Sequence, residues 1–370
     1  MTILKEKPKI IISGGGTGGH VFPAIAIADA IKEKRPEAEI FFVGAKGKLE
    51  MEKVPNAGYP IEGLWISGFY RSLTWRNLTF PVKLISSLLK SVRLVRRFRP
   101  DVAVGVGGYA SGPLLAAATR MGVPALLQEQ NSFPGITNKL LAGRAQRICV
   151  AYEGMERFFP SGKLVLTGNP VRTSFLTQPV EREQAMAHFG LDPGKKTIFL
   201  FGGSLGAQRL NEAVAAQVEV LNEHPEVQLL WQVGKLYHER YQNSEAAQLP
   251  NVRLLSFVDR MDLAYAVADL VVCRAGALTI SELSLLGKAA LLVPSPNVAE
   301  DHQTKNARAL VDKGAAAMVA DTEAAQQLLP RALALLANES QRHTMAENIK
   351  EMARPTAASD IADEVLALVK

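Results

Sequence analysis

The chain has 370 residues, enough for about two domains that each bury their own hydrophobic core. Hydrophobic residues make up 48% and charged residues 21%, a balance that is typical of a soluble globular protein and excludes a disordered one. The formal net charge is +6, and the two cysteines lie far apart, so we expect a cytoplasmic protein with neither a disulfide framework nor a zinc site.

Neither a signal peptide nor a transmembrane helix is expected. The first residues, MTILKEKPK, lack the apolar core of a signal peptide and lead directly into a predicted strand. The longest uncharged run, 102–119, contains four glycines and a proline, so strand, loop and helix describe it better than a membrane span.

Apolar, β-rich runs alternate with helical patterns along nearly the whole chain. In order they read KIIIS, EIFFVG, DVAVGV, ALLQ, RICVA, KLVLTG, TIFLFGG, VQLLWQVG, VRLLSFV, LVVCRA and AALLVP. This alternation predicts βαβ units, and the runs are too many for one ordinary sheet. We therefore predict an α/β protein with two Rossmann-like domains, each a doubly wound parallel sheet, facing a shared interdomain cleft.

A weak internal repeat supports the division into two domains. The segment KIIISGGGTGG is echoed by TIFLFGGSLGAQRL, and each is a strand, a glycine turn and a helix. Glycine and proline punctuate TGNPVRTSF, so we expect an N-terminal domain of 1–167 and a C-terminal domain of 168–354. Residues 355–370 form a short amphipathic helix that could pack on either domain.

The first glycine loop, GGGTGGH, suits a phosphate-bearing ligand. Gly14, Gly16 and Gly19 fit the dinucleotide pattern, in which backbone N–H groups and a helix N-terminus approach a phosphate. A dinucleotide site also needs an acidic residue at the end of the second strand, where Ala45 and Lys46 stand here. We therefore favour a different phosphate-bearing ligand.

His20 follows this loop at the start of the predicted helix. It is either a polar residue at a helix start or a general base, because a near-neutral pKa suits removal of a proton from a hydroxyl nucleophile. The residues alone leave both roles open.

A further candidate site is the segment CRAGALTISELSLLG. A helix that begins after Gly276 would offer N–H groups and the hydroxyls of Thr279 and Ser281 to a diphosphate, with Glu282 placed to accept hydrogen bonds from ribose. The same pattern also describes an ordinary helix start with a glutamate in it.

Two other segments offer polar side chains at the ends of predicted strands. Gln303 and Asn306 of EDHQTKNA share a helix face and are either ligand-binding or surface residues. Arg172 of GNPVR could grip a phosphate through its planar guanidinium. The sequence contains no D-x-D, H-E-x-x-H or Cys/His cluster, so we expect no metal site.

Seven segments, in order from residue 10 to about 310, together resemble the MurG family of bacterial peptidoglycan glycosyltransferases. They are GGGTGGHVFPAIAIA, GVGGYASGPLLAA, QEQNSFPGITNK, GNPVR, GGSLGAQRLN, VVCRAGALTISE and EDHQTKNA. The resemblance implies a two-domain inverting glycosyltransferase of family 28 with the GT-B fold and no cofactor. It also implies UDP-N-acetylglucosamine as donor and the undecaprenyl-linked muramoyl-pentapeptide, lipid I, as acceptor, with lipid II as the product.

The same resemblance assigns roles to individual residues. In the C-terminal domain, the implied donor-binding residues are Arg172, Ser204, Val258 (through its backbone), Ala277, Leu278, Thr279, Ile280, Ser281, Glu282 and Gln303. The implied contacts from the N-terminal domain are Thr17, Gly18, Gly19 and Asn131. His20 is the candidate base for the acceptor 4-hydroxyl and Glu129 a second one, whereas Gln128 stands where some members carry histidine. The last helix is implied to pack on the N-terminal domain.

The positive charge is concentrated in residues 71–100, which hold eight Arg or Lys residues and no acidic residue. A helix there is predicted to pack an apolar stripe against the core and to expose a basic face. The stripe is Ile85, Leu88, Leu89, Val92 and Val95, and the basic face is Lys83, Lys90, Arg93 and Arg97. The flanking aromatic residues, expected to be exposed, are Phe69, Tyr70, Trp75 and Phe80.

Exposed aromatic and basic residues suit a lipid headgroup interface. We predict peripheral attachment of residues 69–99 to the anionic cytoplasmic face of the inner membrane, and contact with a cell-wall and division protein complex. Nucleic-acid binding is the rival use of basic residues, but no recognition motif accompanies them. Alternatives on the same fold are another glycolipid glycosyltransferase, a UDP-N-acetylglucosamine 2-epimerase, or a membrane-associated sensor of sugar nucleotides without turnover.

Overall fold

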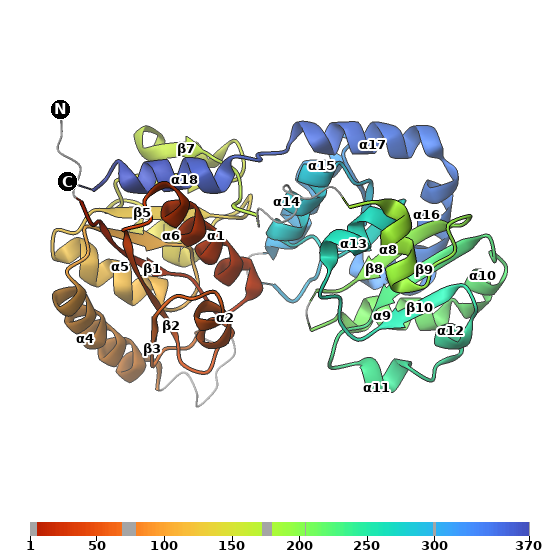
Figure 1. The fold of residues 1–370 in the computed structure, drawn as a ribbon, viewed down its shortest axis with the longest axis horizontal. Coiled ribbons are helices and arrows are strands. Elements are labelled where there is room, and N and C mark those ends of the chain that lie inside the picture. The colour runs from red at the N-terminus through yellow and green to blue at the C-terminus, as the bar shows by residue number, and fades with distance from the viewer. Residues whose placement is uncertain (1–5, 69–78, 172–179, 204, 299–300, 370) are drawn as a thin grey trace. The chain divides into compact units, whose positions relative to one another are not determined.

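The structure is a computed structural model that divides into two compact α/β units (Figure 1). It describes residues 6–68, 79–171, 180–203, 205–298 and 301–369. Unit 1 comprises Met1–Arg172 and Arg354–Lys370, and unit 2 comprises Thr173–Ala353.

The sheet of unit 1 has seven strands, which all run parallel. They are β1 (Lys9–Ser13), β2 (Glu39–Ala45), β3 (Ile61–Leu64), β4 (Val102–Gly105), β5 (Ala125–Glu129), β6 (Arg147–Val150) and β7 (Leu164–Leu166). Their order is β3-β2-β1-β4-β5-β6-β7, so the direction of strand addition reverses between β1 and β4. Such a switch point opens a crevice outside the carboxyl ends of the two strands, which is where ligands bind in open α/β sheets.

Helices cover both faces of this sheet. They are α1 (Gly18–Lys34), α2 (Glu50–Asn56), α4 (Phe80–Phe98), α5 (Ser111–Arg120), α6 (Ile136–Leu141) and α18 (Ala357–Leu366). Ile10 and Ile12 of β1 belong to the core cluster that contains α1 and α18, whereas Ile11 belongs to the cluster that contains α4, α5 and α6. Because both faces are covered, the strands are apolar at nearly every position rather than at alternate ones.

The last helix, α18, belongs to unit 1, although the chain segment Thr173–Ala353 belongs to unit 2. Ile361 and Val365 are fully buried in the core cluster of α1, and α18 runs beside α1 in Figure 1. Lys34 Nζ lies 2.6 Å from Asp363 Oδ1 and supplements the apolar contact. The packing of residues 355–370, which the residues alone left open, is therefore against α1.

Unit 2 repeats the architecture with a six-stranded parallel sheet. Its strands are β8 (Lys196–Phe201), β9 (Val227–Gln232), β10 (Val252–Leu255), β11 (Leu270–Cys273), β12 (Ala290–Leu292) and β13 (Ala317–Met318). The order β10-β9-β8-β11-β12-β13 places the switch point between β8 and β11. The two glycine segments that repeat in the sequence thus follow the first strand at the switch point of each sheet.

The helices of unit 2 also lie on both faces of its sheet. They are α8 (Arg182–Phe189), α9 (Gln208–Ala216), α10 (Val218–Asn222), α11 (His238–Tyr241), α12 (Glu245–Gln248), α13 (Met261–Val267), α14 (Ala277–Leu286), α15 (His302–Val311), α16 (Ala324–Ala337) and α17 (Glu339–Glu351). Ile198 and Leu200 of β8 pack with α9 and α16, whereas Phe199 and Phe201 pack with α8, α13 and α14.

The predicted burial of α4 is wrong in part. Ile85 and Leu89 of the predicted core stripe are 59% and 56% exposed, whereas Ser87 and Ser91 are buried. The small serines allow α4 to approach its neighbours closely, and Ser87 Oγ donates a hydrogen bond to the Trp65 carbonyl oxygen at 3.0 Å. The pattern of apolar side chains did not predict the buried serines. Where two elements approach most closely, a small side chain is needed, whether it is apolar or polar.

The outward face of α4 is apolar in its first half and basic in its second. The exposed residues Val82, Ile85, Leu89, Arg93 and Arg96 follow one another at spacings of three and four, so they form one stripe along the helix. Phe80, which was expected to be exposed, is half-buried against the core, and Phe69, Tyr70 and Trp75 lie outside the described residues. We call Val82, Ile85, Leu89, Arg93 and Arg96 the α4 stripe.

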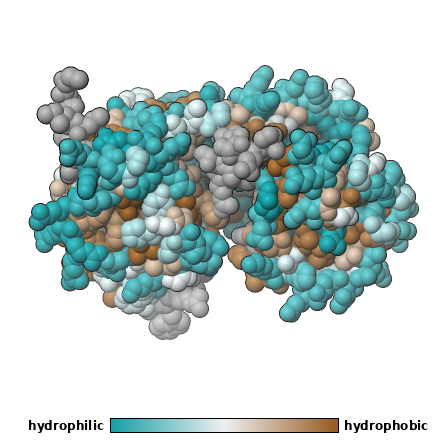
Figure 2. Space-filling view, in the orientation of Figure 1, coloured by the Kyte–Doolittle hydropathy of each residue, from teal (hydrophilic) through white to brown (hydrophobic). Residues whose placement is uncertain are grey.

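Among the helices in the described ranges, none is long and apolar enough to cross a membrane. Hydrophilic residues cover most of the visible face of each unit, with smaller apolar areas between them (Figure 2).

Candidate functional site

The first glycine loop of unit 1 is anchored from beneath by a buried carboxylate. Glu50, at the start of α2, is fully buried, and its two carboxylate oxygens accept hydrogen bonds from the N–H groups of Gly16 and Ala45, both at 2.8 Å. A Cβ at Gly15 would lie 2.2 Å from Glu50 Oε1, so a larger residue there would displace the carboxylate. Sequence reasoning missed Glu50, because nothing in the pattern LEMEK indicates that its first glutamate is buried.

This anchoring decides which backbone groups of the loop can meet a ligand. The N–H of Gly16 is bonded to Glu50, and the N–H of Gly15 reaches the Gly107 carbonyl oxygen at 3.4 Å. The N–H groups of Gly18 and Gly19 lie in the first turn of α1, where a helix supplies no acceptor of its own. They carry the positive end of the helix dipole, as an anion site requires.

A second glycine loop closes the switch point from the side of β4. Gly107 and Gly108 adopt φ of +93° and +88°, which side chains other than glycine rarely accept. A Cβ at Gly108 would lie 2.2 Å from the Gly15 carbonyl oxygen, so the two loops touch backbone to backbone. The pair of glycines directly after a strand was the available signal for this part of the site.

The structure places His20 between the two glycine loops. A Cβ at Gly107 would lie 2.6 Å from His20 Cδ2, so the imidazole packs on the bare backbone of the second loop. His20 Nδ1 lies 3.2 Å from Thr17 Oγ1. When Nδ1–H donates to Thr17, Nε2 is the unprotonated nitrogen and can accept a proton.

Glu129, the second candidate base, is enclosed by protein donors. It is 2% exposed, and Oε1 accepts from the backbone and side-chain nitrogens of Asn131 at 3.1 and 3.2 Å. Oε2 accepts from Asn138 Nδ2 at 2.8 Å and from the Gly135 N–H at 3.1 Å. Burial raises the pKa of Glu129, and these donors oppose the shift. These contacts let the carboxylate position Asn131 and its loop, and they argue against Glu129 as the base that meets a substrate hydroxyl.

Buried amide side chains join the end of β5 to its neighbours. Gln130 Nε2 donates to the Val106 carbonyl oxygen at 2.7 Å, and Gln128 Nε2 donates to Asn169 Oδ1 at 3.1 Å. Asn169 Nδ2 in turn donates to the Gln130 carbonyl oxygen at 3.0 Å. Sequence reasoning gave these side chains no role. They connect the segment GNPV to the candidate site, whereas Arg172, which follows that segment, lies outside the described residues.

In unit 2 the glycine loop after β8 is also held against a neighbouring loop. Gly206, at φ +82°, lies so close to the next strand that a Cβ would be 2.1 Å from the Val233 carbonyl oxygen. Ser204 of this loop lies outside the described residues. The Val258 side chain is buried in the core, which leaves the backbone as the part of this residue that can contact a ligand.

The third predicted segment forms α14, which begins after Gly276 at the carboxyl end of β11. Ala277 and Ile280 are buried in the core, whereas Leu278, Thr279, Ser281 and Glu282 are partly exposed. The hydroxyl of Ser281 donates to the Ala277 carbonyl oxygen at 3.0 Å, so its predicted contact with a diphosphate stays a prediction. Its proton is therefore engaged inside the helix, as is common for serine within helices.

A buried cation lies next to the start of α14. Arg274 Nη1 lies 2.5 Å from Asp321 Oδ1 and also donates to the Val293 carbonyl oxygen at 3.0 Å. Both charged side chains are largely buried. Sequence reasoning missed this pair, because the partners are far apart in the chain. Arg274 holds the ends of β11 and β12 together beneath the site.

Gln303 and Asn306 do not share a role. Gln303 Oε1 accepts from the Ser295 N–H at 2.8 Å, which ties α15 to the loop after β12 and leaves the amide nitrogen as a donor. Asn306 is fully buried, and its Nδ2 donates to the Ala275 carbonyl oxygen at 3.4 Å. The expectation that Asn306 is either a ligand-binding or a surface residue is wrong.

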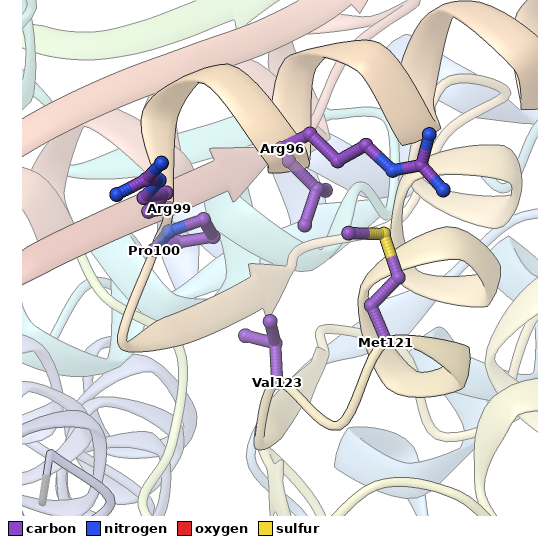
Figure 3. A pocket seen from close by; sticks show the side chains of 6 residues that line it. Arg96, Arg99, Pro100, Met121 and Val123 are labelled. Carbon is purple, nitrogen blue, oxygen red and sulfur yellow. The ribbon is translucent and has the colours of Figure 1, made fainter.

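A cavity of about 530 Å³ lies away from the glycine loops of unit 1 (Figure 3). Its lining is Val95, Arg96, Arg99, Pro100, Met121 and Val123. Since α4 and α5 end there and the next strands begin, it lies at the amino ends of β4 and β5, the edge opposite the switch-point loops. Arg96 and Arg99 point away from each other, so they do not form one anion site. Within the described ranges, no group of three or more His, Cys, Asp or Glu side chains could hold a metal ion.

Family models match most of the chain. The glycosyltransferase family 28 N-terminal domain matches residues 10–150, and the glycosyltransferase family 28 C-terminal domain matches residues 197–364. Two similar relatives, from Bacteroides fragilis and Flavobacterium psychrophilum, are named UDP-N-acetylglucosamine–N-acetylmuramyl-(pentapeptide) pyrophosphoryl-undecaprenol N-acetylglucosamine transferase. The first is 54% identical over 98% of this chain and 96% of the relative, and the second is 50% identical over 99% of both.

Solved structures show the same fold. The crystal structure of Acinetobacter baumannii MurG matches with a TM-score of 0.76 and 30% identity, covering 97% of this chain and 99% of the other. UDP-N-acetylglucosamine 2-epimerase from Neisseria meningitidis matches with a TM-score of 0.68 at 14% identity, covering 98% and 100%, which shows the fold alone.

Two doubly wound parallel sheets, each with a glycine loop at its switch point, define an α/β protein of the GT-B class, as predicted. The chain belongs to glycosyltransferase family 28.

Proposed function

We propose that the protein transfers N-acetylglucosamine from UDP-N-acetylglucosamine to the 4-hydroxyl of the muramoyl-pentapeptide on undecaprenyl pyrophosphate. The reaction converts lipid I to lipid II with inversion at the anomeric carbon. The observation that carries the proposal is 54% identity, over 98% of the chain, to a transferase named for this donor and this acceptor. Glycine loops at both switch points support the proposal, because such loops suit phosphate-bearing ligands.

Unit 2 is proposed to bind the donor. The N–H groups at the start of α14 face the diphosphate, Glu282 accepts hydrogen bonds from the ribose hydroxyls, and the Val258 backbone contacts uracil. Gln303 offers its amide nitrogen to the sugar, because its oxygen is held by Ser295. Arg172 and Ser204, outside the described residues, complete the diphosphate contacts. Negative charge grows on the departing diphosphate in the transition state, and fixed N–H dipoles stabilise that charge without reorganisation.

Unit 1 is proposed to bind the acceptor and to remove its proton. Thr17, Gly18, Gly19 and Asn131 are proposed contacts of the donor, and a hydrogen bond to Glu129 holds the Asn131 side chain. The glycine loop before α1 offers N–H groups to the acceptor pyrophosphate. His20 Nε2 takes the proton of the 4-hydroxyl as that oxygen attacks the anomeric carbon from the side opposite UDP. A positioned base contributes about 10²- to 10⁴-fold to such a step. His20→Ala should therefore lower kcat by about that factor.

The decisive experiment uses the purified protein with radiolabelled UDP-N-acetylglucosamine and a short-chain lipid I analogue in the presence of EDTA. Transfer of label to the acceptor, with a β1→4 linkage shown by NMR, supports the proposal. Turnover of the nucleotide sugar without any acceptor would instead indicate a 2-epimerase, and binding without turnover would indicate a sensor. Loss of transfer in EDTA that Mg²⁺ restores would refute the metal-independent mechanism.

The α4 stripe is the proposed membrane contact, on the cytoplasmic face. Val82, Ile85 and Leu89 are each more than half exposed, and Arg93 and Arg96 have no ion-pair partner among the described residues. Apolar side chains that enter the headgroup region and cations that meet anionic lipid form a typical interfacial helix. Each cation near an anionic surface contributes about 1 kcal/mol.

Sedimentation with vesicles of anionic and zwitterionic lipid tests this surface. We expect Ile85→Ser with Leu89→Ser to weaken binding to both vesicle types, and Arg93→Glu with Arg96→Glu to weaken binding to anionic vesicles by at least about tenfold. Leu236→Ser, which changes a residue of unit 2 that is 69% exposed, is the control. Unchanged binding in both double variants would refute the assignment of the membrane contact to α4.

A further inference from the structure

A buried tyrosine contacts the carboxylate that is proposed to bind the ribose. The hydroxyl of Tyr265 on α13 donates a hydrogen bond to Glu282 Oε2 on α14 at 2.8 Å. Tyr265 is 1% exposed, whereas Glu282 is partly exposed. The hydrogen bond thus reaches from the core of unit 2 to a side chain at its surface.

The aromatic ring that carries this hydroxyl is fixed by the core. Tyr265 meets Phe199 and Phe201 edge to face, with ring centroids 5.9 and 6.1 Å apart. The two phenylalanines stack on each other at 4.7 Å and belong to β8, the strand at the switch point. A ring held on this side by two others has little freedom to turn, so the hydroxyl has one position.

In this pair, Tyr265 is a permanent hydrogen-bond donor and the Glu282 carboxylate is an acceptor that can also meet a ligand. Burial, and then the nearby charge of Glu282, raise the pKa of Tyr265 well above its ordinary value, so the hydroxyl keeps its proton. A carboxylate offers about four acceptor directions, and the tyrosine hydroxyl occupies one of them on Oε2 of Glu282.

We propose that Tyr265 is a positioning residue for nucleotide recognition, which orients the Glu282 carboxylate toward the ribose hydroxyls of the donor. This inference rests on the proposed donor site, and it adds a residue in the core that sets the selectivity of that site. A glutamate side chain has several rotatable bonds, and ordering it costs conformational entropy when the ligand arrives. The hydrogen bond from Tyr265 removes much of that cost before binding.

The alternative is that the hydrogen bond only ties α13 to α14. In that case its loss would lower the melting temperature without changing which nucleotide the protein prefers. The two roles therefore differ in the preference for UDP over 2′-deoxy- and 3′-deoxy-UDP, which lack one ribose hydroxyl each.

Isothermal titration calorimetry with these three nucleotides tests the proposal on the full-length protein. We expect the wild type to bind UDP at least about tenfold more tightly than the deoxynucleotide whose missing hydroxyl meets Glu282, the effect of losing a hydrogen bond to a charged group. Tyr265→Phe should weaken UDP binding by about three- to tenfold and leave binding of that deoxynucleotide nearly unchanged, so the preference shrinks.

The chain offers a matched control in the same unit. Tyr241 is 4% exposed, and its hydroxyl is buried without a hydrogen-bond partner in the described structure. Tyr241→Phe removes the same atom from the other core cluster, so it should leave the preference for UDP unchanged. In a Glu282→Gln background, Tyr265→Phe should have no further effect on the preference, because the acceptor that it orients is already altered.

Each outcome decides between the proposals. A wild type that binds UDP and both deoxynucleotides equally would refute the ribose role of Glu282 in the donor site. A wild-type preference that Tyr265→Phe leaves intact would refute only the positioning role of Tyr265. An equal loss of affinity for all three nucleotides in Tyr265→Phe would likewise show a structural tie rather than positioning.

Discussion

Replacing Glu50 by glutamine tests whether the buried carboxylate shapes the first glycine loop. The two oxygens of Glu50 accept hydrogen bonds from the Gly16 and Ala45 N–H groups, which are both donors. Glutamine has nearly the same shape but carries one oxygen and one NH₂ group. Glu50→Gln therefore points a donor at one of the two N–H groups and leaves that group without an acceptor in the core.

The size of the effect follows from these contacts. Loss of one buried hydrogen bond to a charged group costs about 1.5–3 kcal/mol of unfolding free energy. For a unit of this size, about 2 kcal/mol corresponds to a fall in melting temperature of about 4–8 °C. The loop also carries the start of α1 and His20, and a displacement of about 1 Å in a catalytic group lowers kcat by about 100-fold.

Three measurements on one variant separate the effects. Scanning calorimetry gives the melting temperature, a transfer assay with the lipid I analogue gives kcat, and calorimetric titration gives UDP binding. UDP affinity should stay unchanged, because its proposed site lies in unit 2. Glu52→Gln, on the same helix with its side chain 67% exposed, is the control and should leave all three values unchanged. If Glu50→Gln has the same melting temperature and the same kcat as Glu52→Gln, the anchoring role of Glu50 is refuted.

Other predictions concern packing and titration. Gly107→Ala would place a Cβ 2.6 Å from His20 Cδ2, at a backbone φ of +93° that alanine rarely adopts. The kcat of this variant should therefore fall by about 100-fold, while its UDP affinity stays unchanged. A variant with wild-type kcat would contradict the packing of His20 on this loop. Because the pKa of Tyr265 is raised by folding, the unfolded chain loses this proton first as pH rises above about 10. Urea titrations at several pH values measure the unfolding free energy. Above this pH, that of the wild type should fall by about 1.4 kcal/mol per pH unit more steeply than that of Tyr265→Phe. Equal slopes of unfolding free energy against pH in the two proteins would contradict this. Burial raises the pKa of the Cys149 thiol to about 12 and also raises that of Cys273, so mass spectrometry should find neither alkylated by iodoacetamide at pH 8 until urea is added.

Local patterns in the sequence determined the architecture. Parallel strands with both faces covered are apolar at successive positions, as in Ile10, Ile11 and Ile12. When such strands alternate with helices along the chain, only a few sheet topologies are possible. The glycine loops were also readable, because a turn that joins a strand to a ligand-binding helix needs glycine. The positions that resemble known glycosyltransferases all follow from such contiguous segments.

Only the tertiary structure decided which polar side chains are free to act. The sequence offers Glu129 as a candidate base, and only the structure shows the donors around it, such as Asn138. Likewise, nothing in the sequence singles out Glu50, and only the structure shows its hydrogen bond to the Gly16 N–H. These roles depend on contacts between residues far apart in the chain, whereas a sequence pattern reports the residue type and its nearest neighbours. The exposed apolar half of α4 has the same origin, because the face that a helix buries depends on the shape of what it packs against.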